Sequence, residues 1–353
     1  MSSQTNTNHG VVMATEIVLP GVGEPETLQV RQRALSSLKA GEVLVQVEAT
    51  GVSFAEKAML RGSYPGQPPF PFVPGYDLVG MVTRLGPSVT EVAVGQRVAA
   101  LIKVGGWTDY IVLPVDDLIP VPDGLEAAEV ETTVVNGATA WGMLHDMAKV
   151  RSGQTIVVHG ATGGVGVMLV QLARVAGVRV IGTASPSKFD LVRAIGAEPL
   201  DYHCDDLVAE VRKLAPNGVD AVFDPLGGKS VNNSWRMLGP GGTLVSSGMQ
   251  SKFGSNESLI VLFIILLGKL YLWNALPNGR HAYFFDVNSG KTLRPQKFHQ
   301  RLRTSLTGVF ALLAQGRIQA HVASRVPLEQ AAEAMRQAES GKTVGKVVLV
   351  PGL

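Results

Sequence analysis

The sequence TIVVHGATGGVGVMLVQLA, residues 155–173, decides the fold of this chain. Its first apolar run predicts a buried strand, the glycines predict a tight turn, and the longer apolar run predicts a helix. The segment VRVIGTA (178–184) then predicts a second strand. Because these parts follow one another as strand, turn, helix and strand, we expect a βαβ unit with parallel strands and a right-handed crossover.

Predicted helices and strands continue to alternate as far as the segment TLVSSG (243–248), which indicates an α/β fold with a doubly wound parallel sheet. The region from residue 42 to residue 100 differs, because glycine and proline break it into short β-rich runs. That pattern predicts a compact β domain. Near the C-terminus, residues 296–316 predict a helix, and the last residues predict a final strand.

The composition is that of a globular protein with a large core, since 46% of the 353 residues are hydrophobic and 17% are charged. The formal net charge is +2 and no long basic run occurs, so we expect no nucleic-acid binding. Cys204 is the only cysteine in the sequence, which excludes an intrachain disulfide and a multi-cysteine zinc site. The histidines are scattered, so no metal site is predicted.

Two stretches bear on the location of the protein. The polar start MSSQTNTNHG has neither the basic region nor the apolar region of a signal peptide, so we expect a cytoplasmic protein. The most apolar run, residues 258–268, is about half as long as the roughly 20 residues that a membrane-spanning helix needs. No integral membrane segment is therefore expected.

The glycines of the central unit, spaced GxxGxxG at residues 160, 163 and 166, predict a dinucleotide site. Glycine permits a tight turn and lets backbone N–H groups approach a pyrophosphate, which the helix N-terminus also attracts. We expect the backbone of Gly163, Gly164 and Val165 to contact the cofactor. The alternative is a glycine turn that serves only close packing of strand and helix.

The second strand ends in ASPSK (184–188), where an NAD site usually has an acidic side chain. Ser185 and Lys188 offer hydrogen-bond donors and a positive charge, which suit the 2′-phosphate of NADPH. The sequence therefore favours NADPH over NADH. The alternative is that Lys188 only begins an exposed helix, with a serine as its N-cap.

Eight segments follow one another along the chain: GVSFAEKAMLRGSYP (51–65), PFVPGYDLVGMVTRLG (71–86), VGQRVAAL (94–101), NGATAWGML (136–144), VVHGATGGVGVMLVQLA (157–173), GVDAVFDPLGG (218–228), LGPGGTLVSSG (238–248) and GKTVGKVVLV (341–350). In this order they resemble the zinc-independent quinone oxidoreductase group of the medium-chain dehydrogenase/reductase family. The resemblance runs from about residue 12 to residue 350. The segment LYLWNALPNGRHAYFFDV (270–287) is similar to the VAT-1 subgroup.

The resemblance implies a division into domains. It implies a GroES-like β-rich catalytic domain whose first part is residues 1–134, a Rossmann NADPH-binding domain at residues 135–292, and a C-terminal segment at residues 293–353 that returns to the catalytic domain. It also implies a homodimer formed by extending the Rossmann sheet, with RHAYFFDV (280–287) similar to the edge strand used for that.

The resemblance further implies a reaction without zinc. Zinc enzymes of the family have a Cys and a His-Glu pair in the N-terminal domain, whereas this chain has Gly75, Tyr76 and Asp77 at the His-Glu position and no N-terminal Cys. The implied chemistry is transfer of a hydride from NADPH to a quinone or an α,β-unsaturated carbonyl compound.

The resemblance assigns roles to single residues. Tyr64 matches a tyrosine near the substrate, so it is the predicted catalytic residue and proton donor; alternatively its ring only packs in the loop. Lys346 resembles a residue near the cofactor cleft, or is a solvated charge at a strand start. The other cofactor contacts implied by the resemblance are Ser53, where the family usually has Asn, and Thr139, Tyr202 and Gly248.

Three functions stay open from the sequence. The first is an NADPH-dependent reductase of a small lipophilic quinone or conjugated carbonyl. The second is an NADPH-binding protein with little turnover, like crystallin or vesicle-associated members of the family, which the Ser53 departure favours. The apolar stretch from Leu259 to Leu272 is predicted to be a buried core helix or a substrate lid, and it also allows a third function, peripheral association with a membrane.

Overall fold

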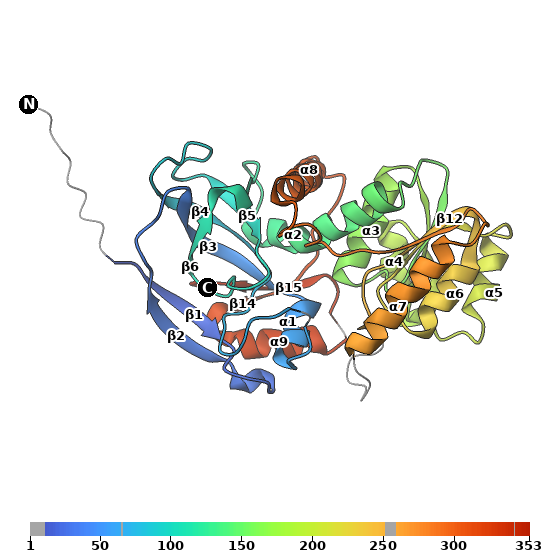
Figure 1. Cartoon of the computed structure of the whole chain (residues 1–353), viewed down its shortest axis with the longest axis horizontal. Helices are drawn as coiled ribbons and strands as arrows, with labels where there is room; N and C mark the ends of the chain where they lie inside the picture. Colours follow the sequence, from blue (N-terminus) through green and yellow to red (C-terminus); the bar gives the residue numbers. More distant parts are fainter. Residues whose placement is uncertain (1–10, 65, 251–258, 342) are drawn as a thin grey trace, which may run out of the picture.

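The computed structural model describes residues 11–64, 66–250, 259–341 and 343–353, and shows two lobes side by side (Figure 1). One lobe is rich in β-strands and contains both the first strands and the C-terminus. The other is built from parallel strands and helices. Helices α2 and α8 lie where the lobes meet (Figure 1).

Within the described residues, the β-rich lobe has a seven-stranded sheet in the order β14-β15-β3-β4-β5-β7, with β6 paired to β3. The strands of this sheet are β3 (Glu42–Val52), β4 (Asp77–Leu85), β5 (Arg97–Leu101), β6 (Tyr110–Pro114), β7 (Leu118–Pro120), β14 (Val322–Pro327) and β15 (Lys346–Val350). A separate antiparallel pair is formed by β1 (Met13–Val18) and β2 (Gln29–Ala34). The last two strands of the chain thus lie in the same sheet as the early ones.

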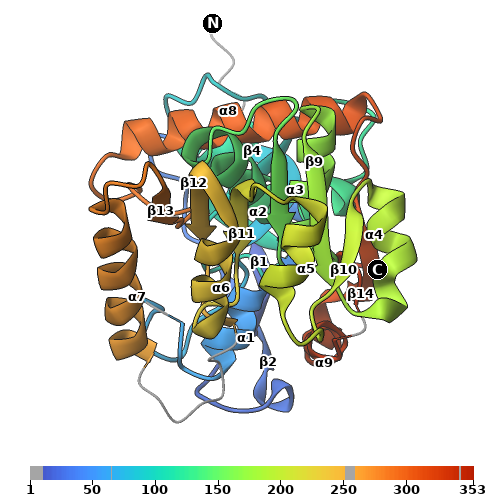
Figure 2. The same ribbon diagram turned by 90° about the vertical axis from the view of Figure 1, so that its right-hand side faces the viewer.

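The second lobe contains, within the described residues, a six-stranded parallel sheet in the order β10-β9-β8-β11-β12-β13 (Figure 2). Its strands are β8 (Thr155–Val158), β9 (Arg179–Ala184), β10 (Glu198–Asp201), β11 (Val219–Asp224), β12 (Leu238–Ser246) and β13 (His281–Phe284). The chain runs outward from β8 in one direction and returns through β11 in the other. This doubly wound parallel sheet beside a β-rich lobe confirms the predicted fold class.

Helices connect and cover these strands. Their bounds are α1 (Phe54–Leu60), α2 (Ala127–Trp141), α3 (Gly164–Val175), α4 (Phe189–Ile195), α5 (Leu207–Leu214), α6 (Lys229–Met237), α7 (Leu259–Asn274), α8 (Pro295–Ala314) and α9 (Ala331–Glu339). Short helical turns are η1 (Pro25–Thr27), η2 (Val115–Asp117), η3 (Gly142–Met147), η4 (Pro186–Lys188) and η6 (Leu328–Gln330). The predicted helix at residues 296–316 is thus confirmed as α8.

The parallel sheet separates two layers of core. Side chains alternate along β8, so Ile156 and Val158 join a core that continues into the β-rich lobe, whereas Val157 faces a second core. Leu266 and Leu270 of α7 belong to that second core. Because the first core includes residues of both lobes, the lobes pack against each other through apolar side chains.

Helix α7 differs from the buried core helix that was predicted for Leu259 to Leu272. Leu266 and Leu270 are buried, but Ile264 is 63% exposed and Tyr271 is 77% exposed. The helix is apolar all round yet packs along one side only, so the prediction of a wholly buried helix was wrong. In the part of the chain that is described, no helix is long and apolar enough to cross a membrane.

The predicted boundary after residue 134 falls inside α2, which lies where the two lobes meet (Figure 1). The helix starts at a cap formed by the Glu126 side chain, which accepts hydrogen bonds from the N–H groups of Ala128 and Glu129. One helix thus runs across the place where the sequence changes texture. The division into domains at residues 134 and 292 stays a prediction.

Candidate functional site

The candidate site lies at the carboxyl ends of the parallel strands. The winding direction of the sheet reverses between β8 and β11, and ligands of such sheets bind in the crevice at that point. Ser185 follows β9, Tyr202 follows β10 and Gly248 follows β12. The fold therefore brings these three predicted residues to one edge of the sheet, on either side of the reversal.

The glycine loop, residues 159–166, joins β8 to α3. Different physical constraints favour glycine at its different positions. Gly160 has φ +64°, a backbone conformation that glycine adopts without strain. A Cβ on Gly166 would lie 2.2 Å from the carbonyl oxygen of Gly160. A Cβ on Gly164 would lie 2.5 Å from the Asn136 side chain on α2. Packing thus accounts for Gly164 and Gly166, as the alternative interpretation expects.

Gly163 is different, since a Cβ there would meet only one atom within 4 Å, the Gly160 oxygen at 3.4 Å. It is the N-cap of α3, and no side chain within the described residues caps this helix. The first N–H groups of a helix have no partner within it, and they are attracted to anions. The loop therefore offers an open backbone surface of the kind that binds a pyrophosphate.

A buried chain of hydrogen bonds supports the loop from below. The Nδ1 atom of His159 is 3.2 Å from the Thr183 hydroxyl, and its Nε2 atom is 3.1 Å from the Ser234 hydroxyl. The Ser234 hydroxyl donates to the Asp224 carboxylate at 2.7 Å. Thr183 in turn accepts from the N–H of Gly160 at 3.2 Å. Burial lowers the pKa of His159 despite the nearby Asp224 carboxylate. These hydrogen bonds could not be predicted from the sequence, because the four side chains come from four separate segments.

The predicted phosphate-binding residues lie together on one side of the loop. The hydroxyl oxygens of Ser185 and Ser187 are 3.2 Å apart. The Lys188 ammonium donates to the Gly341 carbonyl at 3.0 Å. Tyr202 is 50% exposed, at the end of the neighbouring strand. The ammonium and the hydroxyls are thus near the surface, where an anion can reach them.

The segment before β15 connects the glycine loop to the β-rich lobe. Gly163 forms a β-bridge with Gly345, and the next residue, Lys346, begins β15. The Lys188 contact to Gly341 reaches the same segment. The C-terminal part of the β-rich lobe therefore lies against the glycine loop and Lys188.

Lys346 is 3% exposed, so the predicted alternative of a solvated charge was wrong. Its ammonium donates to both carboxylate oxygens of Asp77, at 2.8 and 2.7 Å, and to Glu131 at 2.7 Å. Burial opposes the charge on Lys346, but the two carboxylates outweigh it and raise its pKa. Burial and then the Asp77 charge raise the pKa of Glu131. The ammonium of Lys346 is thus hydrogen-bonded to two carboxylates. A contact between Lys346 and the cofactor stays a prediction.

Ser53 is the N-cap of α1, and Thr139 lies in α2. The Ser53 hydroxyl caps α1, accepting from the N–H of Ala55 at 3.1 Å and donating to the Glu56 carboxylate. Glu56 is buried, and burial raises its pKa although the hydrogen bond from Ser53 opposes this. Thr139 is 9% exposed in α2. A contact of either residue with the nicotinamide stays a prediction.

Tyr64 lies in the loop after α1, and its hydroxyl forms a hydrogen bond with the hydroxyl of Tyr76 at 2.9 Å. Burial raises the pKa of Tyr64 to about 12, although the hydrogen bond with Tyr76 acts in the opposite direction. The Glu56 charge also acts on Tyr64, and the charges of Asp77 and Lys346 act on Glu56. Tyr64, the helix capped by Ser53 and the Lys346 cluster are therefore neighbours in one region of the β-rich lobe.

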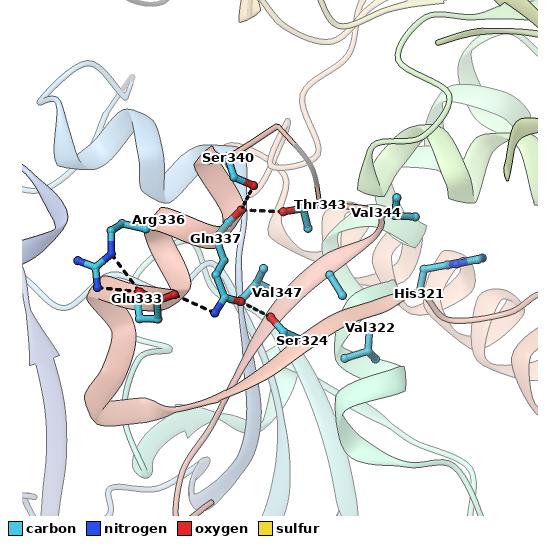
Figure 3. Close-up of a pocket in the computed structure, with 11 residues that line it drawn as sticks. His321, Val322, Ser324, Glu333, Arg336, Gln337, Ser340, Thr343, Val344 and Val347 are labelled. Carbon is cyan, nitrogen blue, oxygen red and sulfur yellow. Dashed lines mark hydrogen bonds and ion pairs between the residues drawn. The ribbon is translucent and has the colours of Figure 1, made fainter. Parts of the chain in front are cut away.

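A cavity of about 780 Å³ lies between α9 and strands β14 and β15 (Figure 3). The Gln337 side chain bonds to Ser324 and Glu333 on its wall, and Val344 and His321 lie at the end nearer the glycine loop. None of the predicted site residues lines it. Elsewhere among the described residues, no group of three His, Cys, Asp or Glu side chains could hold a metal ion.

Fold and crevice together define a class, an α/β protein with a dinucleotide site at the boundary with a β-rich lobe. Two family models match the chain. Residues 39–123 match the alcohol dehydrogenase GroES-like domain, and residues 195–349 match a model described as zinc-binding dehydrogenase. These matches fall in both lobes.

Individual proteins match over nearly the whole chain. The human synaptic vesicle membrane protein VAT-1 homolog is 34% identical over 352 residues, which cover 95% of this chain and 86% of the relative. A quinone oxidoreductase from Pseudomonas syringae has a similar structure, with a TM-score of 0.82 and 27% identity over 96% of this chain and 100% of the other. A mycobacterial protein solved in complex with NADPH has a TM-score of 0.80 and 28% identity, over 96% and 100% of the two chains.

The chain therefore belongs to the medium-chain dehydrogenase/reductase family, in its zinc-independent, VAT-1-like group. It is an oxidoreductase of the type that uses a nicotinamide cofactor.

Proposed function

We propose that this protein is an NADPH-dependent reductase that transfers a hydride to a quinone or an α,β-unsaturated carbonyl compound. The observation that supports it most is the exposed start of α3 at Gly163, which no described side chain caps, at the same edge of the sheet as the Lys188 ammonium and the Ser185 hydroxyl. The similar quinone oxidoreductase and the similar protein in complex with NADPH support the same reaction and the same cofactor.

The described residues fit such a cofactor along the whole crevice. The backbone of Gly163, Gly164 and Val165 would bind the pyrophosphate, because the first N–H groups of α3 point out of the helix there. Residues on the β9 and β10 side would hold the adenosine half and its 2′-phosphate: Ser185, Lys188 and Tyr202. Residues on the other side would hold the nicotinamide half: Ser53, Thr139 and Gly248, with Lys346 behind them.

When bound, the nicotinamide supplies a hydride, which is two electrons and one hydrogen nucleus, to the electrophilic carbon of the acceptor. Negative charge then develops on the carbonyl oxygen of the acceptor. We propose that the Tyr64 hydroxyl donates a hydrogen bond to that oxygen and gives up its proton to it. Water returns a proton to the Tyr64 phenolate, so the protein ends unchanged.

The test of this role is Tyr64→Phe, assayed with a 2-alkenal and with 1,4-naphthoquinone. We expect kcat with the alkenal to fall about 100-fold, since general acids contribute roughly 10²–10⁴ in rate. The dissociation constant for NADPH should stay unchanged, because the phenol does not bind the cofactor. The matched control is Tyr110→Phe on β6, which should keep full activity. An unchanged kcat in Tyr64→Phe would remove this residue from the mechanism.

A second candidate function is an NADPH-binding protein with little turnover. It is favoured by the capping box at Ser53, whose hydroxyl is bonded to Glu56 and to the N–H of Ala55. A hydroxyl held in this way is poorly available to position a nicotinamide amide. Tight NADPH binding without reduction of any acceptor would support this candidate over the reductase.

We also propose a homodimer that forms at β13. Among the described residues this strand lies at the edge of the six-stranded sheet, and an unpaired edge can add a strand from a second copy. The exposed apolar residues of the neighbouring helix α7, such as Ile264 and Leu272, support an interface on this side. Sedimentation equilibrium would measure it, and a monomer at micromolar concentration would contradict it. The cytoplasmic location stays a prediction.

A further inference from the structure

Tyr64 belongs to a cluster of three polar side chains from three separate segments. Its hydroxyl is 2.9 Å from that of Tyr76, and the two rings meet edge to face with centroids 6.0 Å apart. The Tyr76 hydroxyl also accepts a hydrogen bond from the side-chain amide of Asn288. Tyr76 is 3% exposed, so it lies behind Tyr64 and away from solvent. We call these residues the tyrosine cluster.

The cluster bridges the two lobes. Tyr64 and Tyr76 belong to the β-rich lobe, in which Tyr76 directly precedes β4. Asn288 follows β13, the edge strand of the parallel sheet. The position of Tyr64 therefore depends on both lobes, and the contact is formed only where they pack together.

The protons of the cluster can be arranged in two ways. A phenol has one O–H to donate and lone pairs to accept with, and its hydrogen rotates to suit its neighbours. The hydroxyl oxygens of Tyr64 and Tyr76 are 2.9 Å apart, so either phenol can donate to the other. If Tyr64 turns its proton toward an acceptor, its oxygen is free to accept from Tyr76, while Asn288 continues to donate to the Tyr76 oxygen. All three donors then point in one direction, and hydrogen bonds in such a chain polarise one another.

The side chains around the cluster match this arrangement. Burial is the main cause that raises the pKa of both phenols, and the Asp286 charge adds to it. Both tyrosines therefore keep their protons at neutral pH. The Asn288 side-chain oxygen is buried and has no hydrogen-bond partner among the described residues, so the amide is bound in the cluster through its N–H group alone.

We propose that Tyr76 and Asn288 form a positioning relay that directs the Tyr64 proton toward the bound acceptor. This inference rests on the proposed function of Tyr64. The proton leaves Tyr64 for the carbonyl oxygen, and the Tyr76 hydroxyl then donates to the Tyr64 phenolate. Asn288 holds Tyr76 in the orientation that this requires. Water returns the proton to Tyr64, so the relay needs no further reactant.

A double-mutant cycle tests the relay. The variants Tyr64→Phe, Tyr76→Phe and the double variant are compared by kcat for NADPH-dependent reduction of a 2-alkenal. We expect Tyr76→Phe to lower kcat about tenfold, the typical worth of one hydrogen bond, with unchanged KM for NADPH. The double variant should be no slower than Tyr64→Phe alone, because Tyr76 acts only through Tyr64. Losses that multiply would overturn the relay.

The direction of the hydrogen bonds has its own test in Asn288→Asp and Asn288→Ala. A carboxylate accepts where the amide donates, so it would take the Tyr76 proton and leave the Tyr76 oxygen to accept from Tyr64. The relay would then point away from the substrate. Asn288→Asp should therefore lose more activity than Asn288→Ala, and an equal or smaller loss would overturn the proposed direction.

A measurement without ligands separates the relay from the proposed function. With ¹³C at the ring carbon that bears the hydroxyl of each tyrosine, the Tyr64 resonance should shift in Asn288→Ala, although Asn288 bonds only to Tyr76. An unmoved Tyr64 resonance would overturn the relay. Absence of turnover in the wild type would instead overturn the proposed function, and with it any catalytic use of the relay.

Discussion

The glycine loop and the tyrosine cluster are both parts of the candidate site, but they are built in opposite ways. The loop is one continuous segment, residues 159–166, and its properties come from the backbone. The cluster consists of side chains at residues 64, 76 and 288, which meet only in the folded protein. A continuous motif shows its function in the sequence, whereas a cluster of distant side chains has to be found in the structure.

The two regions also differ in the side chains that they need. The glycine loop depends on the absence of side chains, because a Cβ at Gly166 would overlap backbone atoms. The tyrosine cluster depends on the exact side chains present and on contact between the lobes. Between the two regions lies the buried cluster of Lys346, Asp77 and Glu131, next to the bridge from Gly345 to Gly163.

The largest effect is expected at this junction, from Lys346→Ala. Removing the ammonium leaves two buried carboxylates without their cation, and breaking a buried pair costs about 3–5 kcal/mol in the free energy of unfolding. Urea denaturation measures it, with the exposed Lys213→Ala on α5 as control, for which a change within about 0.5 kcal/mol is expected. Normal stability combined with weak NADPH binding would instead show that Lys346 acts on the cofactor.

The next effect tests the loop itself through Gly166→Ala. The new Cβ would lie 2.2 Å from the Gly160 oxygen and 2.9 Å from the Ala161 Cα atom, so backbone must move. Overpacking of this kind costs about 1–3 kcal/mol, and NADPH affinity should fall with it. Gly268→Ala on α7 is the matched control, because nothing lies within 4 Å of its Cβ. It should gain about 0.5–1 kcal/mol. Equal changes in stability and in NADPH affinity in the two variants would contradict the inference that the loop requires glycine at residue 166.

A smaller effect is expected from Lys188→Ala, which removes a side chain and leaves the loop intact. Loss of one charged hydrogen bond to the 2′-phosphate should weaken NADPH binding about tenfold and leave NADH binding nearly unchanged. Titration calorimetry with each cofactor measures this. If both affinities fell equally, Lys188 would have no role in phosphate recognition.

The smallest expected effect is a flat pH profile, which tests the tyrosine cluster. An ordinary tyrosine has a pKa of about 10 and would lose half of its protons at that pH. Because burial raises the pKa of Tyr64 to about 12, the phenol stays protonated below that value. We therefore expect kcat to show no loss from tyrosine ionisation between about pH 7 and pH 10. A decline centred near pH 10 that disappears in Tyr64→Phe would contradict it.

The sequence predicted those parts of the molecule that depend on local pattern. Apolar periodicity and glycine spacing were sufficient for the parallel sheet, for α8 and for the position of the glycine loop. The sequence did not predict that Lys346 is buried, because its partners Asp77 and Glu131 lie far away along the chain. It also did not predict which side of α7 is exposed, since a helix that is apolar all round has no pattern to distinguish its faces.

Tyr76 shows the same limit within the site. In the sequence it occupies a position where a zinc enzyme has a metal ligand, and its residue type predicts only that no zinc is bound there. The structure gives it two hydrogen-bond partners, Tyr64 and Asn288, one from each lobe. Such a role depends on packing between lobes, which residue types alone do not specify.

The most direct test of the central claim is oxidation of NADPH by the wild-type protein in the presence of 1,4-naphthoquinone, 9,10-phenanthrenequinone or a 2-alkenal, with NADH as the comparison. We predict turnover with at least one acceptor and a higher kcat/KM for NADPH than for NADH. No turnover with any of them, together with no measurable NADPH binding, would contradict both the assignment of the crevice and the proposed reaction.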